Sequence, residues 1–153
     1  TVVTDCKGYV GFGDPVQFQE EIERREGIVR QLGMQAMGEA LSAALFPHPA
    51  QAQVRATFVA RWAENDPVAY LAATRSALGW NVIDRLSTLQ CPVLALSSDQ
   101  DYWPVEEKAR QIERIPDSRL VVIPDSRHAL PLEKPDQVNA VLAQFLDECR
   151  NRR

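Results

Sequence analysis

The apolar run from Pro92 to Ser97 constrains the fold of this chain more than any other feature of its sequence. A continuous apolar run of this length, without alternation, is typical of a strand that is covered on both faces. Pro104 suits the start of a helix, and apolar residues follow it at helical spacing as far as Ile115. A second apolar run, Leu120–Ile123, comes next. The order strand, helix, strand predicts a right-handed parallel βαβ unit.

Two further elements complete this predicted sheet. Thr1-Val-Val-Thr4 is a short β-branched run that favours a strand, and the glycines after it indicate a loop. Pro135 opens a last helix, whose apolar residues fall on one face. The fold class is therefore α/β, with a sheet of about three parallel strands. The inward residues expected for the last helix are Val138, Leu142 and Phe145.

The segment between these strands, from Phe18 to about Gln90, has a helical pattern without β character. Gly33 and Phe46-Pro-His-Pro49 separate its helices. Asp66 before Pro67 provides a capping side chain followed by proline at the first helical position, so another helix begins there. The residues expected on the inward faces include Ile22, Val29, Leu32, Met34, Met37, Leu41, Leu45, Leu71 and Leu78.

Two side chains suited to acid–base chemistry follow the predicted strands. Asp101 comes after the first buried strand, and His128 follows the second. Parallel sheets place their chemistry at the carboxyl ends of strands, and an aspartate there can orient a histidine and stabilise its charged form. Asp101 is the favoured acid, with Asp99 as its main competitor and Asp125 as a weaker one. His48, between two prolines, reads as an exposed loop residue.

Composition excludes several classes of function. The formal net charge of -4 and the pI of about 5.2 argue against nucleic-acid binding. The three cysteines show no C-x-x-C spacing, which favours reduced thiols in a cytoplasmic protein. No apolar run approaches the roughly 20 residues that cross a bilayer. Two histidines far apart predict no metal site, and the glycines lack the G-x-G-x-x-G spacing of a cofactor site.

The stretches around both strands resemble the C-terminal half of the α/β-hydrolase family. Ser98 stands where the family's turn before the acid typically has glycine. This resemblance implies that Asp101 is the acid of a catalytic triad and that His128 is its general base. The stretches are Leu86-Ser-Thr-Leu-Gln-Cys-Pro-Val-Leu-Ala-Leu, Ser98-Asp-Gln-Asp-Tyr-Trp-Pro, Leu120-Val-Val-Ile-Pro-Asp-Ser-Arg-His-Ala-Leu-Pro-Leu-Glu-Lys-Pro-Asp-Gln-Val and Phe145-Leu.

The resemblance also implies a division of the chain. Residues 1–15 would be a strand and exit loop of the hydrolase core, residues 16–89 a helical cap, and residues 90–153 a βαβα core that carries the acid and the histidine. Tyr102 and Trp103, next to the acid, are candidates for lining a substrate pocket, as is Trp80. The alternative, that these aromatic side chains only pack between cap and sheet, stays open.

The nucleophile of such a triad is absent from the sequence. None of the serines has the flanking glycines of G-x-S-x-G, the motif that a strained nucleophile turn requires. The family's order places that motif upstream of Thr1. We therefore expect the C-terminal part of a serine-type hydrolase that cleaves an ester, lactone or related bond in a small hydrophobic or aromatic substrate. Its expected partner is an upstream hydrolase segment or a second copy of the chain.

A different class of function also fits the pattern. The strand at Thr1-Val-Val-Thr4 would be an exposed edge without an upstream neighbour, and exposed edges pair readily with other chains. The chain would then be a non-catalytic assembly module.

Overall fold

The computed structural model describes residues 1–4, 15–77 and 80–152. The predicted loop after the first strand and the predicted inward residue Leu78 lie outside this part of the chain. The chain divides into two compact units: a sheet unit of Thr1–Val10 with Val82–Arg153, and a helical unit of Gly11–Asn81. The sheet unit includes a 3-10 helix, η2 (Ile83–Thr88), which the sequence assigned to the cap.

The sheet unit contains three parallel strands. They are β1 (Val2–Thr4), β2 (Val93–Ser98) and β3 (Ser118–Ile123), in the order β1-β2-β3. Ala95 lies opposite Val3 on one side and Leu120 on the other. This arrangement confirms the predicted α/β class with three parallel strands, and it brings the carboxyl ends of β2 and β3 to the same edge.

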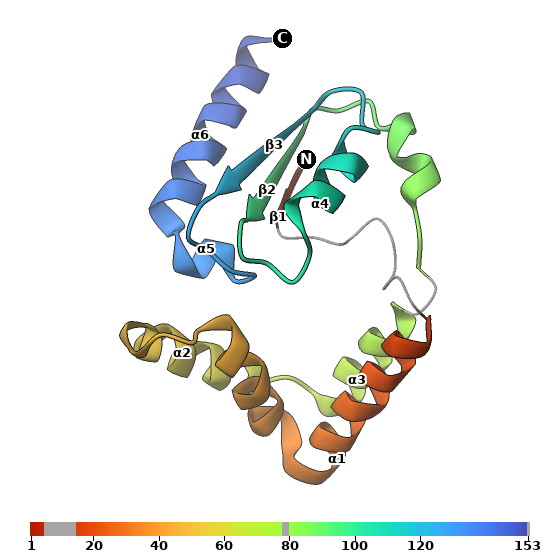
Figure 1. Ribbon diagram of the computed structural model, residues 1–153, viewed down its shortest axis with the longest axis vertical. Helices are drawn as coiled ribbons and strands as arrows, with labels where there is room; N and C mark the ends of the chain where they lie inside the picture. Colours follow the sequence, from red (N-terminus) through yellow and green to blue (C-terminus); the bar gives the residue numbers. More distant parts are fainter. Residues whose placement is uncertain (5–14, 78–79, 153) are drawn as a thin grey trace. The chain divides into compact units, whose positions relative to one another are not determined.

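Both faces of β2 are covered, as its uninterrupted apolar sequence predicted. Leu94 and Leu96 pack against α5 (Leu130–Glu133) and α6 (Pro135–Asn151), whereas Val93 and Ala95 pack against η2 and the end of α4 (Val105–Ile112). Figure 1 shows α4 and α6 on opposite sides of the sheet. Every residue of β2 is buried because successive side chains of a strand point to opposite faces.

The last helix packs as its sequence pattern predicted. Val138 and Phe145 are buried in the cluster around Leu94, and Leu142 packs against it. These residues lie three to four positions apart along α6, so they share one face of the helix.

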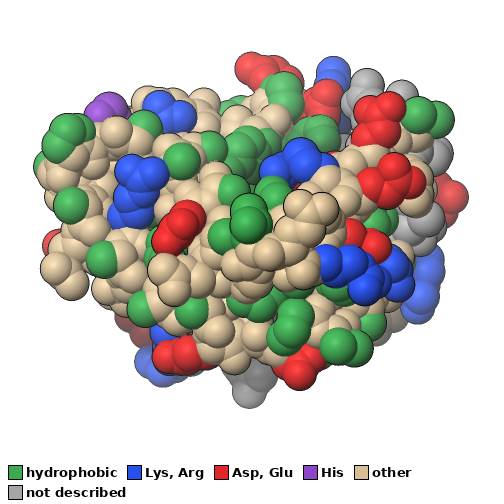
Figure 2. Space-filling model, turned by 90° about the horizontal axis from the view of Figure 1, so that it is seen from below, with side chains coloured by type: hydrophobic (Ala, Val, Ile, Leu, Met, Phe, Trp, Pro, Cys, Tyr) green, Lys and Arg blue, Asp and Glu red, His purple; other side chains and the backbone are tan. Residues whose placement is uncertain are grey.

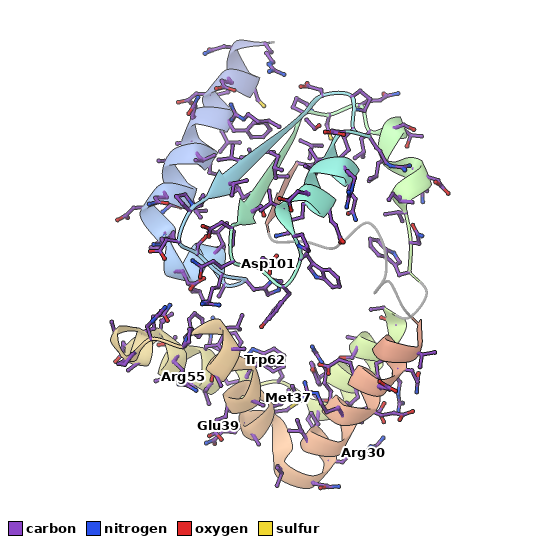
Figure 3. The ribbon with its side chains drawn as sticks, in the orientation of Figure 1. Arg30, Met37, Glu39, Arg55, Trp62 and Asp101 are labelled. Carbon is purple, nitrogen blue, oxygen red and sulfur yellow. The ribbon has the colours of Figure 1, made fainter. Side chains whose placement is uncertain are left out.

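The helical unit contains α1 (Pro15–Leu45), the 3-10 helix η1 (Pro49–Gln51), α2 (Ala52–Ala63) and α3 (Pro67–Ser76). Its core consists of Val29, Met34, Met37 and Leu71, with Trp62 packed against them. Figure 3 labels Met37 and Trp62 near the place where α1 and α2 meet. Acidic and basic side chains are both spread among hydrophobic ones on the face shown in Figure 2.

Gly33 interrupts α1 with a non-helical backbone conformation, φ 84° and ψ 178°. The break changes which side of the helix faces the core. Met34 and Met37 are buried after it, but Leu32, just before it, is 69% exposed. The prediction that Leu32 points inward is therefore wrong: its spacing from Val29 suggested the buried face, but at the last position before the break its side chain is exposed.

The start of α3 confirms the predicted cap. The Asp66 side chain accepts a hydrogen bond from the backbone N–H of Ala69 at 2.8 Å, and Pro67 occupies the first turn. The carboxylate satisfies a backbone N–H that has no partner within the helix. Proline lacks the backbone N–H that would have no partner at its position. In the part of the chain that the structure describes, no helix combines the length and the apolar character needed to cross a membrane.

Candidate active site

The candidate site lies where β2 and β3 end. Figure 3 labels Asp101 in the loop that follows β2. The backbone N–H of Gln100 donates to the carbonyl of Ser126 at 3.0 Å, and the Ser98 hydroxyl donates to the carbonyl of Arg127. These two bonds join the loops that carry the acid and the histidine. The predicted proximity of the two loops thus has a hydrogen-bonded basis.

Asp99 stabilises the turn that leads to the histidine. Its two carboxylate oxygens accept from the backbone N–H groups of Asp125 and Ser126, at 3.0 and 3.1 Å. These backbone donors hold the pKa of Asp99 below its ordinary value. Asp125 has φ 54°, a left-handed conformation that is uncommon outside glycine, and its side chain pairs with Lys134 at 3.3 Å. Of the two competing acids, Asp99 therefore binds this turn from the loop after β2, and Asp125 lies within it.

Asp101 and His128 are in direct contact. The distance from His128 Nδ1 to Asp101 Oδ1 is 2.7 Å. A carboxylate only accepts, so the imidazole Nδ1–H donates and Nε2 is left to accept a proton. The aspartate side chain is fully buried, whereas 40% of the histidine side chain is exposed. The structure thus brings together the acid and the base that the sequence singled out.

A lysine that the sequence analysis did not single out binds the other oxygen of this aspartate. Lys108 Nζ donates to Asp101 Oδ2 and, at 2.9 Å, to the hydroxyl of Ser97. Burial raises the pKa of Asp101, but the hydrogen bonds from His128 and Lys108 and their charges outweigh it, so this pKa lies below its ordinary value. The carboxylate is therefore ionised at neutral pH.

One signal in the sequence pointed to this lysine. Lys108 lies four residues before Ile112 in α4, so both occupy the same face of the helix, and both are buried. A lysine on the inward face of a helix after an acid-bearing strand needs a buried acceptor. Ser97, in the fully buried strand β2, carried no comparable signal.

The aromatic candidates have different positions. The rings of Tyr102 and His128 lie side by side with centroids 5.0 Å apart and planes tilted by 45°, and the Tyr102 backbone N–H donates to Asp101 Oδ1 at 2.7 Å. Trp103 is half-buried in the same loop, and Trp80 is exposed in the helical unit. The structure brings Tyr102 to the site, and the predicted pocket roles of Trp103 and Trp80 stay predictions.

The helical unit has a cavity of its own. About 650 Å³ of space lies between the second half of α1, η1 and α2. Its lining mixes small apolar residues with the charged or polar side chains of Gln35, Glu39, Ser42, His48 and Arg55. His48 is exposed, as its position between two prolines indicated. Within the described ranges, no group of three or more His, Cys, Asp or Glu side chains is placed to hold a metal ion.

Comparison with solved structures identifies the fold. No protein-family profile matches the chain, and no curated protein matches its sequence. Solved structures do match. An esterase from Thermogutta terrifontis is 24% identical, with a TM-score of 0.80 over 97% of this chain and 55% of the other. A carboxylesterase structure from Nitrososphaera gargenis is 20% identical, with a TM-score of 0.81 over 99% and 57%.

An enol-lactonase from Burkholderia xenovorans is 18% identical, with a TM-score of 0.80 over 95% of this chain and 55% of that enzyme. The chain therefore spans about half the length of the enzymes that it matches. Its fold is that of part of an α/β-hydrolase, and the predicted resemblance is confirmed at the level of fold.

Proposed function

We propose that this chain supplies the acid and the base of a serine-type α/β-hydrolase that cleaves an ester, a lactone or a related bond. The observation that carries the proposal is the 2.7 Å contact between His128 Nδ1 and Asp101 Oδ1 at the carboxyl ends of β2 and β3. A buried, ionised carboxylate against a half-exposed imidazole is the arrangement that general-base catalysis requires.

In the proposed mechanism, His128 Nε2 takes the proton of a nucleophilic hydroxyl group on a segment outside this sequence. The hydroxyl oxygen attacks the carbonyl carbon of the substrate, and the imidazolium then gives its proton to the leaving group. Water hydrolyses the acyl-enzyme by the same route. Asp101 fixes the tautomer of His128 and stabilises the imidazolium in both steps.

The proposed substrate class rests on the structural neighbours and on the residues beside His128. The structural neighbours include esterases and an enol-lactonase, so acyl transfer to water is the favoured reaction. Tyr102 lies beside His128, and an aromatic ring there suits a small hydrophobic or aromatic acyl group. We propose Trp103 and Trp80 as further pocket residues. We also propose that the protein is cytoplasmic and that the reaction needs no cofactor.

A fluorophosphonate probe tests this function. The chain alone should show little labelling, because the sequence contains no G-x-S-x-G motif. The chain combined with a hydrolase segment that supplies a G-x-S-x-G nucleophile should be labelled and should hydrolyse a p-nitrophenyl ester. His128→Ala should lower the hydrolysis rate about 10⁴-fold or more, with His48→Ala as the matched control. An assembly whose rate survives His128→Ala would exclude the assigned base.

A second candidate function is an assembly module that pairs through β1. One observation favours it: among the described strands, β1 bonds only to β2 and so lies at one edge of the sheet. An upstream hydrolase segment and a second copy of this chain are the proposed partners. A stable complex that never reacts with the probe would support the module over the hydrolase.

A further inference from the structure

We propose that Lys108 is a positioning residue that tunes the basicity of His128 through the carboxylate they share. Its ammonium group binds one oxygen of Asp101 while the imidazole binds the other, so the lysine limits how strongly the carboxylate stabilises the protonated histidine. The catalytic meaning of this effect rests on the proposed hydrolase function, but the effect itself is a property of the folded chain.

Lys108 is held in place from two sides. Its side chain is 7% exposed, and it lies between the fully buried side chains of Asp101 and Ser97. The Ser97 hydroxyl donates to the carbonyl of Ser98 at 3.0 Å and accepts from Lys108 Nζ at 2.9 Å. This chain of donors runs in one direction only, because an ammonium group donates and cannot accept. The lysine is therefore fixed relative to the end of β2.

The ammonium group changes the field at the imidazole. Both ions are removed from water, which makes the attraction between Lys108 and Asp101 stronger than at the surface. A carboxylate whose charge is partly balanced on one oxygen attracts a cation at its other oxygen less strongly. Asp101 should therefore hold a protonated imidazole less strongly than it would without Lys108 on its other oxygen.

Three other charged groups around the histidine loop, Asp99, Glu133 and Lys134, have partners in the turn itself. Asp99 is bound to the backbone of Asp125 and Ser126, and Glu133 accepts from the backbone N–H of Arg127 at 2.7 Å. Lys134 pairs with the Asp125 side chain, and Arg127 directly precedes the histidine. Lys134 provides a matched control, because removing its charge changes the cations near the histidine loop without touching Asp101.

The titration of the two histidines by NMR tests the proposal on the 153-residue chain itself. In Lys108→Met, the midpoint of His128 should rise by about one pH unit, because the full charge of Asp101 now acts on the imidazole. Lys134→Met should leave the midpoint nearly unchanged, and Lys108→Arg should restore it by returning a cation. His48, in the helical unit, is the internal reference in every spectrum.

A midpoint of His128 that does not rise in folded Lys108→Met, or that rises equally in Lys134→Met, would overturn the proposal. If Lys108→Met does not fold, the unchanged chain still decides. A lysine ammonium held by Ser97 and Asp101 exchanges its protons slowly with water, and its ¹⁵N signal should move in Asp101→Asn. A Lys108 ammonium signal that exchanges at the rate of an exposed lysine would overturn the proposal as well.

The two proposals fail separately. A titration that shifts as expected in a chain that never becomes active with a nucleophile-bearing hydrolase segment would refute the hydrolase and leave the role of Lys108 standing. In an active assembly, Lys108→Met should move the acidic limb of the pH profile of kcat/KM upward by the same pH unit. An unmoved limb would refute the tuning even if the enzyme is active.

Discussion

At the scale of single residues, two aspartates in one loop perform different tasks. Asp99 binds backbone N–H groups of the turn after β3, whereas Asp101 binds the side chains of His128 and Lys108. Both side chains gain hydrogen bonds that favour the ionised form, and the pKa of each lies below its ordinary value. Only Asp101 contacts the imidazole, so a change at each position should have a different effect.

Asp101→Asn should lower the titration midpoint of His128, because the imidazolium loses its counter-charge while Lys108 remains nearby. In an active assembly the same change should reduce kcat on the order of 10⁴-fold. Asp99→Asn should instead cost about 1 kcal/mol of unfolding free energy and leave the His128 midpoint in place. NMR titration and urea unfolding measure both effects. Equal shifts of the midpoint in the two variants would contradict this assignment.

Glu21 provides a residue-scale effect of pH on the helical unit. Its carboxylate binds Arg24 and Arg25 through Nε atoms at 2.7 Å in each case. The hydrogen bond from Arg24 is the largest cause of a pKa lowered to about 2; burial opposes it, and Arg25 adds to it. A carboxyl group with a depressed pKa stabilises the fold above the pKa of the unfolded chain. That contribution disappears as the pH falls toward 2.

Glu21→Gln should therefore lower the unfolding free energy at pH 7 by about 1 kcal/mol, since two partly exposed ion pairs are lost. The difference between the variant and the unchanged chain should shrink between pH 4.5 and about 2. Urea unfolding followed by circular dichroism at several pH values measures it. Glu20→Gln, one position earlier, is the control. A difference that stays constant with pH would refute the assignment.

At the scale of elements, the break in α1 depends on a conformation that glycine alone adopts without strain. Gly33 has φ 84° and ψ 178°, a region that is essentially restricted to glycine. An added Cβ would meet no atom within 4 Å at Gly33 or at Gly27, so space does not distinguish the two sites. Gly27 lies within regular helix before the break. The two positions therefore separate backbone strain from crowding.

Gly33→Ala should destabilise the helical unit by about 1–3 kcal/mol, the cost of holding a side-chain-bearing residue in this region. Gly27→Ala should stabilise it by about 0.5–1 kcal/mol, because alanine favours the helix over the unfolded chain. Chemical denaturation of the two variants measures both values. If Gly33→Ala proved as stable as Gly27→Ala, the kink would not require glycine.

At the scale of the whole molecule, each compact unit has its own core. The sheet unit depends on the cluster in which β2, β3, α5 and α6 meet. Leu94 is fully buried at its centre, packed with Leu130 and Phe145. The same strand leads to Asp101, so the core that stabilises this unit also fixes the position of the acid.

Leu94→Ala should cost about 2–5 kcal/mol of unfolding free energy, because it removes buried methyl groups and leaves a cavity. Leu132→Ala should stay within about 0.5 kcal/mol, since Leu132 is 52% exposed. Urea midpoints of the two variants provide the comparison. Equal midpoints would show that the cluster around Leu94 does not determine the stability of the sheet unit.

Much of the site followed from the sequence because local patterns reflect local physics. The apolar runs predicted β2 and β3, and Pro104 and Pro135 predicted the starts of α4 and α6. Asp66 predicted the cap of α3. Strand ends in a parallel sheet meet at one edge, so Asp101 and His128 were expected to be close. Leu32 was wrongly predicted to point inward, because helical spacing from Val29 does not show what the fold packs against the last residue before the break at Gly33.

What the sequence determined by itself is the order of elements and the two strand ends at which an acid and a histidine meet. The sequence favoured Asp101 over Asp99, the structure showed that Asp101 is the one that touches the imidazole, and the tertiary structure alone decided which cation shares the carboxylate. Asp99 and Asp101 both follow β2, and only the packing of the turn at Asp125 against one and of α4 against the other separates them. Such contacts join residues distant along the chain, and their geometry depends on the whole fold.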